Sequence, residues 1–336
     1  MFNVPESAAA GSGFRCAEHA VRVYEADIEV CRKLAVKDGA LHYVAHITSG
    51  IFDFAFEQPG VRPQSSAVSD AFDRAGRQLN LTVTQLDETC RPLDSGTLTR
   101  VVIQGDSGAL FQFLKRTSQT FFGLTLGGSR REIDEADSQM ARLSESAVRR
   151  IGAQSLNWGG FKDREASGEL RQTYQLVVSA RPAISPYVAR SDFPVPDEIS
   201  RACRAALGAG GLHFVGIYRG GRQTWCADVF DDPALEPLFQ RVTPELRRSG
   251  YSMLARQVHL QSRRLEQLLD VVRSDRLTRL VLEVARGGIF VLPLTQDDYL
   301  VGATLDQAGV RSADGRAQGL QEKIRGLWRT HLWRMR

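Results

Sequence analysis

Two stretches of this chain read almost alike. Residues 98–103 are LTRVVI, and residues 277–282 are LTRLVL, 179 positions further along. The match continues without a gap through Gly108 and Gly287, and it ends at residues 125–126 and 304–305, which are both Thr-Leu. Because a gapless match of this length seldom arises by chance, the sequence predicts two copies of one structural unit.

A shorter match lies upstream of the first one. Residues 39–44 are GALHYV and residues 210–215 are GGLHFV, 171 positions further along, so the second copy carries eight extra residues between its two matching blocks. The glycines and prolines between the copies have linker composition. We therefore predict a flexible N-terminus over 1–14, a first domain over 15–152, a linker over 153–194 and a second domain over 195–336.

Apolar residues at helical spacing mark the helices of each unit. The long helix of the second copy is predicted to begin at the N-cap Thr243 with Pro244 at its first position, and its counterpart runs from residue 66 to about residue 86. Its apolar stripe, interrupted by Gly250, consists of Leu246, Leu254, Val258, Leu265, Leu268, Leu269 and Val272. Shorter helices are expected in the segments 28–35, 131–151, 199–206 and 320–333.

Strand patterns occupy the rest of each unit. Ser49-Gly50 and Gly220-Gly221 are typical of tight turns that join two strands into a hairpin, and three more strands follow each long helix. The strands after those turns are expected at 51–56, 98–104, 109–114 and 119–126, and at 224–230, 277–284, 288–294 and 299–305. A further short strand is possible over 172–179. The order α-β-β-α-β-β-β-α predicts an α+β fold in which helices flank a mainly antiparallel five-stranded sheet in each copy.

The second copy carries a family resemblance. Residues 287–294 are GGIFVLPL and residues 298–302 are DYLVG. With the element order, this pattern resembles the Roadblock dynein-light-chain superfamily, which has a profilin-like fold and includes bacterial regulators of small Ras-like GTPases. The first copy shares the resemblance through the repeat. Members generally lack catalytic residues and pair through their long central helices and a middle sheet edge, so the resemblance implies two tandem Roadblock-like domains forming an intrachain pseudo-dimer.

Composition narrows the class of protein. Of the 336 residues, 43% are hydrophobic and 24% charged, as in a globular protein. The five cysteines include no CxxC pair, which favours a reducing compartment and no structural zinc. The N-terminus lacks the apolar core of a signal peptide, and no run of eighteen apolar residues occurs. We therefore expect a cytoplasmic protein without a cofactor.

Positive charge gathers in the second copy. Residues 244–336 contain sixteen Lys or Arg against ten Asp or Glu. Five of these arginines lie beside the apolar stripe of the long helix and are the candidate partner-binding residues: Arg247, Arg248, Arg256, Arg263 and Arg264. The resemblance implies a protein partner, such as a small GTPase or a second copy of the chain. A solvated basic face is the alternative for the helix, and nucleic-acid binding is the alternative function. Membrane contact through the Trp- and Arg-rich C-terminus ranks lower.

Possible catalytic motifs do not survive comparison of the two copies. Residues 105–109 are GDSGA, which resembles the nucleophile loop of trypsin-like serine proteases, with His46 upstream as a base. The second copy has VARGG at 284–288, so the position needs a turn glycine and not a serine. His42 and His46 would lie about 13 Å apart along one strand, too far for one metal ion. The chain also lacks a P-loop motif, and the sequence therefore predicts no enzyme.

Overall fold

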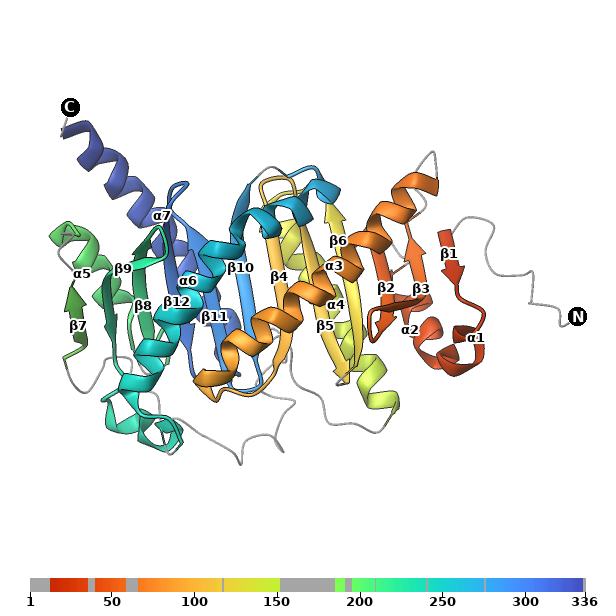
Figure 1. Ribbon diagram of the computed structural model, residues 1–336, viewed down its shortest axis with the longest axis horizontal. Coiled ribbons are helices and arrows are strands. Elements are labelled where there is room, and N and C mark those ends of the chain that lie inside the picture. The colour runs from red at the N-terminus through yellow and green to blue at the C-terminus, as the bar shows by residue number, and fades with distance from the viewer. Residues whose placement is uncertain are drawn as a thin grey trace, which may run out of the picture.

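A computed structural model of the chain describes residues 13–35, 40–58, 66–116, 118–151, 185–190, 195–208, 210–239, 241–274 and 276–334. Within these residues, twelve strands form one continuous antiparallel sheet in the order β1-β3-β2-β6-β5-β4-β10-β11-β12-β8-β9-β7 (Figure 1). The predicted α+β class with a mainly antiparallel sheet is therefore confirmed. Most of the expected linker and the possible strand at 172–179 lie outside the described residues.

Each half of the chain contributes six neighbouring strands to the sheet. The first half consists of β1 (Gly13–Cys16), α1 (Ala20–Val23), α2 (Glu25–Ala35), β2 (Tyr43–Thr48), β3 (Ile51–Glu57), α3 (Ser66–Cys90), η2 (Arg91–Leu93), β4 (Leu98–Gly105), β5 (Gly108–Arg116), β6 (Gln119–Leu126) and α4 (Arg130–Arg150). The second consists of β7 (Tyr187–Arg190), α5 (Asp197–Ala206), β8 (Phe214–Arg219), β9 (Arg222–Asp228), η5 (Pro233–Phe239), α6 (Pro244–Leu269), η6 (Asp270–Val272), β10 (Leu277–Val284), β11 (Gly287–Pro293), β12 (Asp298–Thr304) and α7 (Val310–Arg334).

The prediction of a separate five-stranded sheet in each copy needs correction. The extra strands are β1, which pairs with β3, and β7, which pairs with β9. Both are four residues long, and β7 lies within the residues expected as linker. A strand this short has too few residues to show an alternating pattern, so only its pairing with a neighbour defines it.

The two halves join in the middle of the sheet. β4 pairs with β10 so that Val102 lies opposite Val281, and these two valines occupy corresponding positions in the repeat. A pseudo-two-fold axis therefore passes between them and relates one half to the other. On one face of the sheet, α3 and α6 pack against each other, as Figure 1 shows. A second apolar core lies on the opposite face of the sheet, against α2, α4, α5 and α7.

Buried charges surround this junction. Arg100 on β4 donates two hydrogen bonds to Asp137 on α4 and one, of 2.8 Å, to Glu283 on β10. The corresponding Arg279 donates to Asp314 on α7 and, over 2.9 Å, to Gln104 on β4. The two clusters thus repeat across the axis with two differences: Gln104 stands where its counterpart is Glu283, and Arg279 also lies 3.5 Å from the partly exposed Asp134 of α4. A neutral amide at position 104 avoids one more buried carboxylate beside two arginines.

Helix starts show where local sequence signals succeed and fail. The Thr243 hydroxyl accepts the backbone N–H of Leu246 at 3.4 Å, and Pro244 is the first residue of α6, which confirms the predicted start. The last helix begins at Val310, ten residues before the predicted start at 320. Gly315 and Gly319 weaken its sequence signal, but buried Ala313 and Ala317 hold this part of the helix against the sheet.

Arg100 provides the test of the central junction. We expect Arg100→Ala to lower the free energy of unfolding by about 3–5 kcal/mol, because Asp137 and Glu283 would stay buried without their shared cation. Urea denaturation followed by circular dichroism measures this change. Arg130→Ala removes an exposed ion pair with Glu322 and should cost less than about 1 kcal/mol. Equal losses in the two variants would contradict a special role for the junction.

Candidate functional site

Two of the five candidate arginines on α6 are engaged within the protein. The side chain of Arg247 is 4% exposed and donates a 2.9 Å hydrogen bond to the Ser95 hydroxyl. Arg248 forms a double hydrogen bond with buried Asp228, at 2.7 and 2.8 Å, and its guanidinium lies 3.9 Å from the ring centre of Tyr187 on β7. These two residues therefore hold α6 to its neighbours and do not belong to an outward basic face.

The other three candidate arginines lie on the outer surface. Arg256, Arg263 and Arg264 are all exposed on α6. Arg264 donates a 3.0 Å hydrogen bond to Gln85 on α3, and these two residues occupy corresponding positions in the repeat. This contact therefore marks where the pseudo-two-fold axis leaves the helix layer. The three exposed arginines lie on α6 at and beside this crossing point.

Exposed apolar side chains accompany these arginines. On α6, Leu246 is 61%, Met253 52% and Leu260 68% exposed, and their spacing of seven residues places them along one stripe. On α3, Leu81 is 59% exposed and corresponds to Leu260 in the repeat. The sequence places Leu246 in the apolar stripe of the long helix, but the residue is exposed because it lies on the outward stripe with Met253 and Leu260, whereas Arg247 in the same turn is buried. We call Leu81, Leu246, Met253, Leu260, Arg256, Arg263 and Arg264 together the α3/α6 face.

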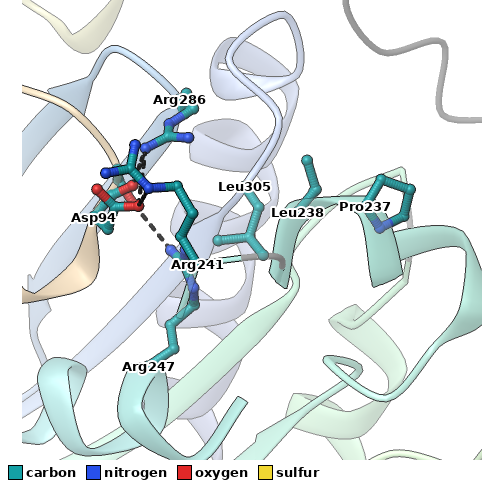
Figure 2. Close-up of a pocket in the computed structure, with 8 residues that line it drawn as sticks. Asp94, Pro237, Leu238, Arg241, Arg247, Arg286 and Leu305 are labelled. Carbon is teal, nitrogen blue, oxygen red and sulfur yellow. Dashed lines mark hydrogen bonds and ion pairs between the residues drawn. The ribbon is translucent and has the colours of Figure 1, made fainter. Parts of the chain in front are cut away.

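A pocket opens where the two halves meet beside the start of α6. Its empty space is about 460 Å³, including the part open to solvent. The lining residues are Asp94, Ser95, Pro237, Leu238, Arg241, Arg247, Arg286 and Leu305. Figure 2 shows the three arginines on the side of Asp94, whereas Pro237, Leu238 and Leu305 lie on the other side. Arg241 and Arg286 approach the Asp94 carboxylate at 3.3 and 3.4 Å.

Sequence reasoning missed most of this pocket. Asp94 and Ser95 come from the first half and the other lining residues from the second, so the cavity exists only because the halves pair. The helical turn η5, which supplies Pro237 and Leu238, lies between β9 and α6, where the second copy carries its extra residues. That length difference was the one available signal, since Asp94 and Ser95 are far from the three arginines along the chain.

The protease-like residues are not brought together. The backbone N–H of Ser107 donates to the Ser274 hydroxyl at 2.8 Å in the turn after β4. His46 pairs with Phe121 near the start of β6, whereas Gly127, just beyond the end of β6, bonds to Ser107. Ser107 and His46 therefore lie at opposite ends of that strand, and their arrangement provides no serine–histidine pair.

His46 instead belongs to a buried polar cluster of the first half. Its Nδ1 lies 2.8 Å from one oxygen of Asp53, and the exposed His19 lies 2.9 Å from the other oxygen. Thr48 donates to Asp53 at 2.6 Å. Isoleucine and threonine stand at the second-copy positions of His46 and Asp53, so this cluster is particular to the first half.

His42 and His213 have a shared structural role. The backbone N–H of Leu126 donates to Nδ1 of His42 at 3.1 Å, and that of Leu305 donates to Nδ1 of His213 at 2.8 Å. Both contacts fasten the end of the strand that pairs with the histidine's own segment, at the last residue of β6 and at the residue after β12. Within the described ranges, no group of three or more His, Cys, Asp or Glu residues is placed to hold a metal ion.

Comparison of the chain with protein-family models, with curated proteins and with solved structures found no match. None of the helices that the structure describes has the length and apolar character needed to cross a bilayer. All five cysteines are free thiols, and only Cys16 is partly exposed. The α3/α6 face, the pocket and the polar clusters are the candidate functional features of the described residues.

The His46 cluster makes stability depend on pH. Burial lowers the pKa of His46, even though its hydrogen bond to Asp53 opposes that change. Burial by itself would raise the pKa of Asp53, but hydrogen bonds from His46, Thr48 and His19 outweigh it and lower the pKa. As the pH falls below about 6.5, His46 is protonated in the unfolded chain at a higher pH than in the folded protein. The folded state therefore loses stability as the pH falls through that range, and loses more at lower pH as Asp53 titrates.

His46→Asn tests this dependence. The asparagine amide retains a donor toward Asp53 but does not titrate, so the loss of unfolding free energy between pH 7 and pH 5.5 should be smaller in the variant than in the wild type. Urea denaturation at both pH values measures the loss of unfolding free energy in the variant and in the wild type. These two losses are compared, and not the absolute stabilities, because the smaller asparagine changes the packing at both pH values. His259→Asn, outside the cluster, should keep the wild-type difference. An unchanged difference in His46→Asn would argue against the cluster.

Proposed function

We propose that this protein is a non-catalytic interaction protein whose α3/α6 face binds a partner protein. The observation that carries the proposal is the set of large apolar side chains left exposed on two helices that are themselves firmly packed. Clustered exposed apolar residues of this kind mark protein-binding surfaces. Leu81 and Leu260 flank the pseudo-two-fold axis, and Arg256 and Arg263 supply charge beside them. Such a surface fits an acidic partner with an apolar centre.

We further propose that the partner is a small Ras-like GTPase, and that the chain acts in the cytoplasm. The pairing of β4 with β10 and the packing of α3 on α6 support the interpretation as two Roadblock-like domains joined in an intrachain pseudo-dimer. Because Arg74 on α3 corresponds to the exposed Met253 on α6, the face is asymmetric. We expect one partner molecule per chain.

Nucleic-acid binding is less well supported. Part of the positive charge in residues 244–336 is used internally, since Arg248 pairs with Asp228 and Arg279 pairs with Asp314. Those guanidinium groups are mostly buried and do not face outward for phosphate contacts. The net charge of this segment therefore overstates the basic surface that it presents.

Leu260→Asp tests the proposed face. We expect the wild-type chain to bind a small GTPase of the source organism in one nucleotide state, and the variant to bind about thirtyfold more weakly, because a central apolar contact becomes a desolvated charge. Calorimetric titration with the GDP- and GTP-loaded GTPases measures the affinities, and GTP turnover is followed in parallel.

Val23→Asp is the matched control, because Val23 is 69% exposed on α1 and lies outside the face. It should bind like the wild type. Failure of every small GTPase to bind in either nucleotide state would reject the GTPase assignment. Equal weakening by both substitutions would reject the α3/α6 face as the binding surface.

A further inference from the structure

The pocket between the halves carries an excess of positive charge. Arg241, Arg247 and Arg286 line it, and Asp94 is the one carboxylate among the described lining residues. Three guanidinium groups against one carboxylate leave a net charge of about +2, since arginine stays protonated at neutral pH. Because Arg241 is 74% and Arg286 48% exposed, their ion pairs with Asp94 are weak and can be rearranged at little cost.

Arg247 is the unusual member of the group. It is 96% buried, and no carboxylate of the described residues lies within ion-pair distance of it. Its Nε–H has no hydrogen-bond partner among the described residues, and its guanidinium lies 5.4 Å from the ring centre of Phe239. A buried cation with an unused donor is costly unless an anion accompanies it. The pocket therefore provides a built site for a negatively charged group.

The repeat provides an internal comparison. The positions of Arg247 and Arg286 are occupied in the first copy by Val68 and Ser107, and Arg273 stands where Asp94 would be. The fold itself thus needs neither arginine, because the other copy forms the same elements without them. Arg247 and Arg286 of the basic pocket are therefore features of the second copy that the repeat does not share.

We propose that this pocket binds a small molecule that carries a phosphate monoester. A phosphate monoester has a charge of about −1.5 to −2 at neutral pH, which matches the pocket's excess, and its oxygens can accept from several guanidinium groups at once. Pro237, Leu238 and Leu305 form an apolar wall opposite the arginines and contact the organic part of the ligand (Figure 2). This site does not depend on the proposed binding of a GTPase to the α3/α6 face.

Calorimetric titration of the full chain with phenyl phosphate, inorganic phosphate and phenol tests the proposal. Phenyl phosphate should bind most tightly, inorganic phosphate more weakly, and phenol not measurably. Arg286→Gln and Arg241→Gln should each weaken phenyl phosphate binding about tenfold, because each removes a charge-assisted contact. Because about half or more of each side chain is exposed, replacing either one should leave the fold intact. Circular dichroism of the two variants checks this.

Arg222→Gln is the matched control, since it removes the same charge from an exposed position in the β8–β9 hairpin. It should bind phenyl phosphate like the wild type. Equal weakening in all three variants would show general electrostatic attraction and overturn the proposal. The absence of binding by phenyl phosphate and inorganic phosphate would overturn it too. A phosphoserine peptide is titrated as a further probe. If that peptide bound and phenyl phosphate did not, the proposal of a small-molecule ligand would also be overturned.

Discussion

The pairing of β4 with β10 is the constraint on which the rest of the molecule depends. Each half would otherwise end in a strand with unpaired backbone groups, and the central pairing removes both edges. It also places Arg100 beside Glu283 and Arg279 beside Gln104, so that charges from both halves meet in a nearly dry environment. Because buried charges tolerate little displacement, these contacts favour the observed register of β4 against β10 over registers shifted along the strands.

The same junction positions both candidate binding surfaces. It brings α3 and α6 together, which creates a two-helix surface that neither half has alone. It also places Asp94 of the first half against Arg241 and Arg286 of the second and thereby closes the basic pocket. A symmetric framework thus carries asymmetric surfaces, since the exposed apolar stripe and the buried Arg247 both belong to α6.

Divergence between the copies is concentrated where the framework does not need it. Both copies have the histidine that fastens the end of β6 or β12, and both have the turn glycine of the hairpin. The His46–Asp53 cluster belongs to the first half alone, and the η5 segment with its pocket belongs to the second. Comparing the copies therefore separates residues that the fold requires from residues that can serve a function.

The sequence by itself determined the repeat, the α+β class, the hairpins at Ser49-Gly50 and Gly220-Gly221 and the start of α6 at Pro244, because periodicity, turn chemistry and capping depend on near neighbours in the chain. Only the tertiary structure decided that Leu246 is exposed, that Arg247 is buried and that β1 and β7 extend the sheet. It alone brought Asp94 to Arg286, which lies 192 residues away. Such contacts follow from how whole elements pack, and no local pattern encodes them.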